Sequence, residues 1–284
     1  MVKFIPKNDL VTKRQRLIEL PIHDRLMVAV VAVGFSGLER GWNHADLMAP
    51  FWRLYANDAP GAAVRVGRTW LPLEPDHLYL IPAWMKFASR AAGRIGHAFA
   101  HFDVRGLSAP AVRLAFPEPT SIADTAGAAK LLTLGTALLG GAGPAPELVL
   151  QVRSLADAAL ANAITHLSPA MRTRALPGLE RGALGAVLAH LHADKTTPMT
   201  NRDLARIAGC TPDHLVRIFR RDLGQTPARY VQELRMAAAA KALTHSSDDI
   251  DVIAERFGFA NRHGFTRAFT RHLGCGPAAW RRRF

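Results

Sequence analysis

The first part of the chain consists of short apolar segments separated by turn-forming residues. Four such segments predict strands, at residues 26–33, 62–66, 78–81 and 97–104. Residues 57–61 and 74–76 are two of the intervening stretches, and both contain Pro. Many short strands punctuated by Pro and Gly are typical of an antiparallel sandwich or barrel. We therefore predict a β-domain over residues 1–119.

The pattern changes between residues 120 and 175. Residues 121–139 and 147–167 are rich in Ala and Leu, and a Gly-rich break separates them. In the second segment, apolar residues recur at helical spacing, namely Leu148, Val152, Leu155, Ala159 and Ala163. We expect an antiparallel helix pair that links two domains. Its apolar stripe is a candidate surface for a homodimer; the alternative is that it packs on the β-domain of a monomer.

Residues 176–284 are helical in pattern and contain an internal repeat. Each copy has a small Ala (Ala205, Ala254) followed four residues later by a Gly (Gly209, Gly258). The Ala lets a second helix cross closely, and the Gly gives the backbone the freedom that a tight turn needs. The repeat therefore predicts two helix-turn-helix units in tandem.

The helix after each turn has a cap, an inward apolar side and an outward basic side. Thr211 with Pro212 caps the first such helix, and Asn261 caps the second. Phe219 and Phe269 occupy equivalent inward positions. Between the units, residues 226–243 predict one helix of about 27 Å. That length is close to the roughly 34 Å between successive major-groove faces of DNA, so both helices can contact one side of a duplex.

Composition and charge favour an acidic partner. The chain has 284 residues, 49% of them hydrophobic and 21% charged, as expected of a globular protein. Its net charge of +13 favours nucleic acid or an anionic membrane surface. Residues 176–284 carry 17 Lys and Arg against 10 Asp and Glu, so their share is 17 − 10 = +7.

Cysteine use and apolar runs suggest a cytoplasmic protein. Cys210 and Cys275 are the only two cysteines, and their surroundings show neither metal-site spacing nor a disulfide framework. A reduced compartment is therefore expected. The longest apolar run, residues 26–33, is too short to cross a bilayer.

Residues 204–284 resemble the DNA-binding domain of the AraC/XylS family. The resemblance rests on Ile253-Ala254, Gly258-Phe259, Phe265-Thr266-Arg267-Ala268-Phe269, Gly274 and Pro277. Gly276 stands where the family usually has Thr, and Trp280-Arg281 where it has Tyr-Arg. The resemblance implies a sequence-specific transcription regulator that is not an enzyme. Its expected partners are double-stranded operator DNA, a small-molecule effector and RNA polymerase.

The family's geometry implies which side chains contact DNA. The positions that match its base-reading residues are Asp213, Val216, Arg217, Arg262, His263, Thr266 and Arg267. Arg can read guanine through O6 and N7, and Thr can contact a thymine methyl group. Asp213 and Val216 suit base reading less well, so the first copy matches the pattern more weakly. The expected phosphate contacts are Arg220, Arg221 and Arg271.

Residues 51–55, 58–62 and 78–82 resemble the cupin-like effector domain found in this family. This likeness implies a small barrel whose interior can hold a small molecule. The candidates for its wall are Trp42, Trp52, Arg53, Trp70 and Trp84. For each aromatic residue, ordinary core packing is the alternative. Arg53 and Trp52 are neighbours on one strand and face opposite sides, so only one of them lines the interior.

Two enzyme classes compete with this interpretation. His97 and His101 share a strand face, and with His44 or His77 they would form the metal site of a cupin enzyme. The His-x-His and downstream Glu cluster of catalytic cupins is absent, so we expect no metal and no cofactor. A DNA-repair methyl acceptor would need an activated Cys among metal-binding Cys residues, whereas Cys210 and Cys275 lie in predicted turns.

Together these patterns predict an α+β chain of three parts. Residues 1–119 form an N-terminal cupin-like β-barrel that binds an effector, and residues 120–175 form a helical linker. Residues 176–284 form an all-α domain with two helix-turn-helix units.

Overall fold

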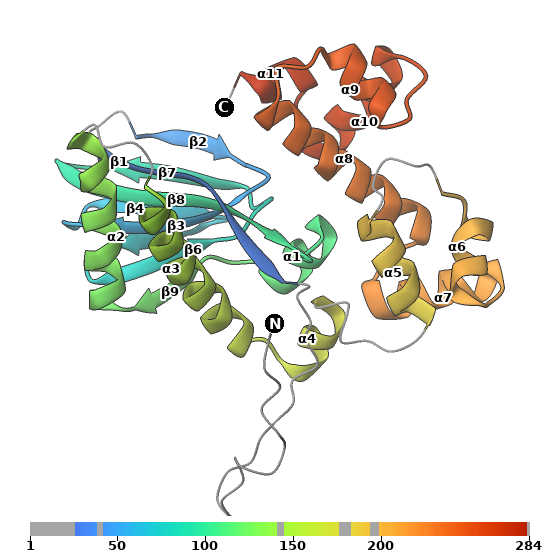
Figure 1. Cartoon of the computed structure of the whole chain (residues 1–284), viewed down its shortest axis with the longest axis horizontal. Helices are drawn as coiled ribbons and strands as arrows, with labels where there is room; N and C mark the ends of the chain where they lie inside the picture. Colours follow the sequence, from blue (N-terminus) through green and yellow to red (C-terminus); the bar gives the residue numbers. More distant parts are fainter. Residues whose placement is uncertain (1–25, 39–41, 141–144, 176–182, 194–198, 283–284) are drawn as a thin grey trace, which may run out of the picture.

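The computed structural model describes residues 26–38, 42–140, 145–175, 183–193 and 199–282 (Figure 1). A domain of two β-sheets lies beside an elongated helical domain, and α8 (Pro227–His245) forms the spine of the latter. The α+β class predicted from the sequence is confirmed. Within the described ranges, no helix is both long enough and apolar enough to span a membrane.

Two antiparallel sheets form the β-domain. The first has the order β1-β8-β3-β6-β9, with bounds Met27–Leu38, Ile95–Arg105, Trp52–Asn57, His77–Ile81 and Thr120–Ala123. The second has the order β2-β7-β4-β5, with bounds His44–Leu47, Phe87–Ala91, Ala62–Val66 and Thr69–Leu73. All four predicted strands are present, and the first and last are longer than expected.

Strand β3 is buried on both faces, which decides where its side chains point. Trp52 and Leu54 belong to the core on the helix-covered face of the first sheet. Tyr55 belongs to the core between the two sheets, together with Val64, Tyr79 and other residues. Arg53 alternates with Trp52 and Leu54 and therefore faces the space between the sheets, as does Tyr55.

Helices α2 (Thr125–Ala137) and α3 (Pro146–Thr165) pack on the first sheet. Helix α1 (Ala109–Ala115), which lies between β8 and β9 in the chain, packs against α4 (Pro169–Ala175) and α8. Figure 1 shows α2 and α3 side by side across this sheet, as the predicted helix pair. The expected boundary at residue 119 needs correction, because β9 pairs with β6 in the same sheet. Four residues are too few to show strand alternation in the sequence.

The helical domain has two cores, one on each half of α8. The first unit consists of α5 (Ala183–Ala193), α6 (Asn201–Ala208) and α7 (Pro212–Leu223), packed on Tyr230, Val231 and Leu234. The second consists of α9 (Ile250–Arg256), α10 (Arg262–Leu273) and α11 (Pro277–Arg281), packed on the second half of α8. The predicted helix over residues 226–243 is confirmed, with small differences at its ends.

Candidate functional site

Local interactions place the second helix of each unit. The Thr211 side chain accepts a hydrogen bond from the backbone N–H of His214, and the Asn261 side chain accepts one from Gly264. Both predicted caps are therefore present. Gly209 and Gly258 have φ angles of 62° and 69°, in the left-handed region that favours Gly. The two turns are thus built alike, and α7 and α10 occupy equivalent places.

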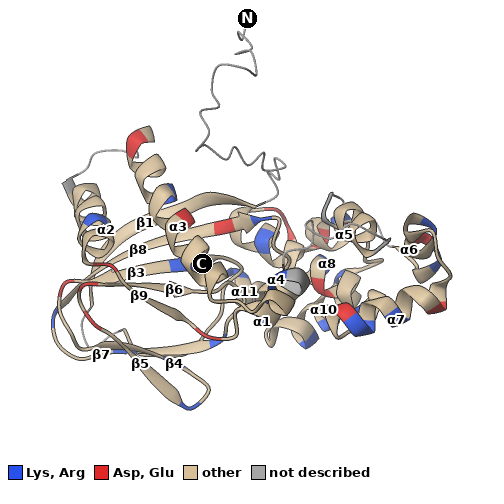
Figure 2. Cartoon of the chain, turned by 90° about the horizontal axis from the view of Figure 1, so that it is seen from below, with Lys and Arg blue, Asp and Glu red and all other residues tan. Residues whose placement is uncertain are grey.

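The outward faces of α7 and α10 carry exposed basic side chains. On both helices the inward Phe, Phe219 or Phe269, is completely buried. Figure 2 shows basic positions on both helices. Among the predicted DNA-contacting residues, Val216 and Thr266 are half-buried, and the others are exposed: Asp213, Arg217, Arg220, Arg221, Arg262, His263, Arg267 and Arg271.

Two of these arginines are held by acidic neighbours. Arg221 pairs with Asp222 at 2.6 Å, and Arg262 pairs with Asp251 at 3.1 Å. Exposed pairs of this kind contribute little free energy, so a phosphate can replace the carboxylate. In the part of the chain that the structure describes, Arg267 and Arg271 form no ion pair.

The structure brings the predicted base-reading residues of the second unit together. Arg262, His263, Thr266 and Arg267 all line one open groove between α10 and α11. Arg282, just beyond α11, lines the same groove and is not among the residues predicted from the sequence. The basic run at residues 281–283 is the signal that could have identified it.

The five candidate effector-binding residues lie in different places. Arg53 and Trp42 face the space between the sheets, and Trp42 packs edge-on against Tyr55 with ring centroids 6.4 Å apart. Trp52 faces the helices and packs against Phe116. The other two lie elsewhere: Trp70 is stacked with Arg65 and Arg90 on the outer face of the second sheet, and Trp84 is at the interface between the domains.

The two histidines predicted to share a face do so; His97 is buried and His101 is half-buried. The Nδ1 atom of His97 lies 2.7 Å from the Oδ1 atom of Asn57, at hydrogen-bond distance. Burial lowers the pKa of His97 to about 4. Burial, followed by the charge of Arg53, lowers the pKa of His101 to about 3. Both rings are therefore neutral at pH 7, and no group of three metal-ligating residues occurs among the described residues.

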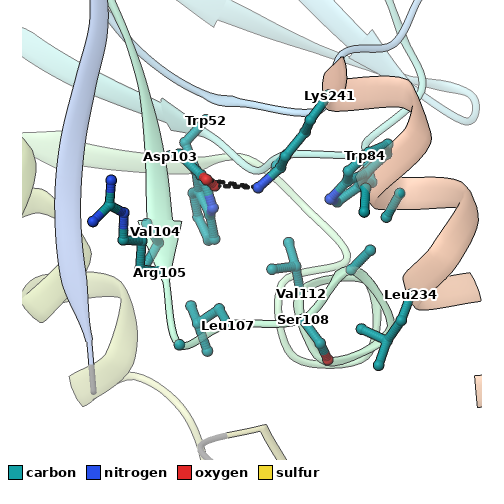
Figure 3. Close-up of a pocket in the computed structure, with 15 residues that line it drawn as sticks. Trp52, Trp84, Asp103, Val104, Arg105, Leu107, Ser108, Val112, Leu234 and Lys241 are labelled. Atoms are coloured by element: carbon teal, nitrogen blue, oxygen red, sulfur yellow. Dashed lines mark hydrogen bonds and ion pairs between the residues drawn. The ribbon is translucent and has the colours of Figure 1, made fainter. Parts of the chain in front are cut away.

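A second cavity lies between the two domains (Figure 3). Its volume is about 390 Å³, and its walls include Trp52, Trp84 and Val112 from the β-domain side and Leu234 from α8. Lys241 extends from α8 and donates to both carboxylate oxygens of Asp103, at 2.6 and 2.7 Å (Figure 3). The sequence does not indicate this cavity, because its two sides come from distant parts of the chain.

Two further contacts hold the domains together. Tyr230 of α8 donates a hydrogen bond of 3.0 Å to Ser108 at the start of α1. Trp84 stacks on Trp280 with ring centroids 6.5 Å apart. Trp84 has a φ of 65°, a conformation that costs energy for a residue other than Gly. The β-domain and the second helix-turn-helix unit therefore share one continuous apolar core.

Residues 204–283 match the protein family described as a helix-turn-helix domain. This match supports the resemblance to the DNA-binding domain of the AraC/XylS family that the repeat and its motif carry. A similar protein is the HTH-type transcriptional regulator Rv1931c of Mycobacterium tuberculosis, 35% identical over 82 residues. Another is the HTH-type transcriptional regulator GlxA of Rhizobium meliloti, 30% identical over 210 residues.

These likenesses differ in how much of each protein they cover. The matches to the two regulators cover 29% and 69% of this chain, and the chain spans 32% and 63% of their lengths. The solved structure of ToxT from Vibrio cholerae O395 has the same fold, with a TM-score of 0.53 and 10% identity. That match covers 88% of this chain and 96% of ToxT. It supports the cupin-like assignment of the β-domain.

Proposed function

We propose that this protein is a sequence-specific DNA-binding transcription regulator controlled by a small-molecule effector. The observation that carries the proposal is the pair of equivalent helices α7 and α10, each capped, each anchored by a buried Phe and each exposing Arg. The regulators similar to this chain are named for transcription control, which supports the same role. The protein would therefore act by binding DNA and not as an enzyme.

The spacing of the two helices suits one face of a duplex. Helix α8 has 19 residues and is therefore about 28 Å long. Two units joined by it can enter successive major grooves. Arg267, Thr266 and their neighbours in the groove would contact base edges, whereas Arg220 and Arg271 would contact phosphates. Control of transcription would act on RNA polymerase at a nearby promoter.

The interface between the domains offers a path from effector to DNA. A structure of ToxT with the same fold is described as bound to an unsaturated fatty acid, which supports control by a small molecule in this chain. Helix α8 carries both helix-turn-helix units and contacts the β-domain through Lys241 and Tyr230. A ligand that changed these contacts would therefore change the placement of both DNA-contacting helices.

Selection of DNA from a random library with the full chain tests the proposed function. We expect enrichment of one motif with two half-sites about 10 base pairs apart, one for each unit. Arg68→Ala is the control for arginine substitutions on α7 and α10. It also removes one positive charge, but from the exposed tip of the β4–β5 hairpin in the other domain. Failure to enrich any motif would refute sequence-specific binding.

The interdomain ion pair predicts a measurable coupling. Asp103 and Lys241 are about two-thirds buried, so their attraction is only partly screened by water. A double-mutant cycle with Asp103→Asn and Lys241→Met should give a coupling of about 1 kcal/mol in the free energy of unfolding by urea. The exposed pair Asp46–Lys86 is the control, expected below about 0.5 kcal/mol. Zero coupling for Asp103 and Lys241 would mean that the domains separate in solution.

The environment of α3 indicates whether its apolar stripe is free to form a homodimer. The apolar stripe of α3 is used inside the chain, because Val152, Ala156 and Ala159 are buried against the first sheet. We therefore infer that this stripe does not form a homodimer. Leu155 is half-buried at its edge, so Leu155→Asp should lower the melting temperature and leave the sedimenting mass unchanged. A dimer that Leu155→Asp converts to a monomer would contradict the inference.

A further inference from the structure

Arg53 is a charged side chain in an apolar interior. It lies in the middle of β3, is only 5% exposed and faces the space between the two sheets. Its guanidinium carbon lies 4.9 Å from the ring centroid of Phe51 and 5.1 Å from that of Phe87. The two rings hold the charge in place but do not neutralise it. A buried cation in such surroundings is costly unless an anion pairs with it.

The described residues around Arg53 supply no such anion. The Arg53 guanidinium forms a hydrogen bond with the Tyr55 hydroxyl. The Nη1 atom of Arg53 is buried and has no hydrogen-bond partner among the described residues. His101 and His97 are the nearby titratable rings, and burial keeps both neutral. Asp46, the acidic residue in the adjoining cavity, is already paired with Lys86 at 2.9 Å.

A cavity leads to this guanidinium from the side of β2. Its volume is about 460 Å³, enough for a small organic molecule. Apart from Arg53, its lining comes from residues 43–48, among them Leu47 and Met48. Arg53 is thus the one member of β3 that reaches the cavity. The lining of the cavity combines apolar side chains, polar side chains and the Arg53 cation: Asn43, His44, Ala45, Asp46, Leu47, Met48 and Arg53.

We propose that this cavity binds a small organic carboxylate with an apolar body, whose carboxylate pairs with Arg53. The planar guanidinium fork matches the two oxygens of a carboxylate, and Arg53 lines the cavity from which a carboxylate would approach it. The apolar body would lie along Leu47 and Met48, a contact that inorganic anions cannot make. The idea that this ligand is the effector rests on the proposed function, but binding of the carboxylate does not.

The first test asks whether Arg53 is kept at a cost to stability. Arg53→Met replaces the unpaired cation by an apolar side chain of similar length, so the ligand-free variant should melt about 2–10 °C higher than the wild type. Arg68→Met is the control, because Arg68 is exposed in the turn between β4 and β5, so its charge is solvated and its replacement should give no such gain. A lower melting temperature for Arg53→Met would show a structural role for Arg53 and overturn the proposal.

The second test uses paired probes on the full chain. Butanoate, cyclohexanecarboxylate and phenylacetate at millimolar concentration are compared with their neutral amides and with inorganic phosphate. At least one carboxylate should raise the melting temperature of the wild type and of Arg68→Met, but not of Arg53→Met. A shift that survives Arg53→Met, a shift matched by the amide or by phosphate, or no shift with any carboxylate would overturn the proposal.

A DNA-binding measurement separates this proposal from the proposed function. Without ligand, Arg53→Met should bind the selected DNA with the affinity of the wild type, because Arg53 lies inside the β-domain. Retained DNA binding with lost carboxylate binding supports the Arg53 site. If the carboxylate stabilises the wild type but not Arg53→Met, and the wild type selects no DNA motif, the ligand site stands and the proposed regulator is refuted.

Discussion

Phe269→Ala is expected to unfold the second helix-turn-helix unit and strongly weaken binding to DNA. The Phe269 side chain is completely buried and packs edge-on against Trp280, with ring centroids 5.9 Å apart. Removal of such a ring typically costs about 3–5 kcal/mol, through lost burial and the cavity that remains. That loss is comparable to the whole stability of a small helical unit. Urea unfolding followed by circular dichroism measures the cost, and fluorescence anisotropy measures DNA affinity.

Phe219→Ala provides the matched variant in the first unit. Phe219 is also completely buried and packs edge-on against Tyr230 at 5.7 Å. Its core is separate from that of the β-domain, whereas the core around Phe269 is continuous with it. Phe269→Ala should therefore also weaken the contact between Trp84 and Trp280, which Phe219→Ala leaves intact.

The milder change Phe269→Leu keeps most of the apolar volume of the side chain. This variant should therefore retain much of the stability and DNA affinity that Phe269→Ala loses. Full DNA binding by a well-folded Phe269→Ala variant would contradict the placement of Phe269 beneath α10.

Arg267→Ala is expected to weaken binding to the selected DNA motif by about 1–3 kcal/mol, or roughly 5- to 150-fold. Arg267 is exposed in the middle of α10, in the groove that it shares with Thr266 and His263. A long arginine at this position can donate two hydrogen bonds to O6 and N7 of guanine. Its loss should therefore relax the preference at one base pair, whereas loss of a phosphate contact would weaken all sequences alike.

Arg68→Ala separates this specific effect from a general loss of positive charge. Arg68 lies in the β4–β5 turn of the other domain, so its removal should leave both affinity and base preference unchanged. Equal affinity and an unchanged motif for Arg267→Ala would show that α10 does not read DNA through this residue.

The helical domain could be predicted from the sequence because its signals are local. Thr211 and Asn261 cap their helices within three residues, and Gly209 and Gly258 occupy turns that need a positive φ. Each of these signals depends on neighbours in the chain and not on distant packing. Their repetition in two copies made the architecture and the class of the domain predictable.

The β-domain was predicted less completely, for physical reasons. Strand β2 is short and half polar, and β5 contains Pro72, which disfavours a strand assignment. Strand β3 is buried on both faces, so its sequence shows no alternation that would tell Arg53 from Trp52. The two orientations of Arg53 could be separated only by the structure, in which α2 and α3 cover the other face of the sheet.

The cavity between the domains depends entirely on tertiary structure. Asp103 and Lys241 are separated by 138 positions in the chain, and Ser108 and Tyr230 by 122. Each of these residues is an ordinary polar residue in its own segment. Nothing in the sequence near either partner indicates that the two will meet.

Hydroxyl-radical footprinting of the full chain on its selected DNA motif tests the central claim most directly. Two helix-turn-helix units joined by α8 should protect two segments about 10 base pairs apart on the same face of the duplex. At protein concentrations that still allow residual binding, Phe219→Ala should lose the protected segment of the first unit. Phe269→Ala should lose that of the second unit. A single protected segment that neither variant alters, or protection without any preference for sequence, would contradict the proposed pair of DNA-contacting helices.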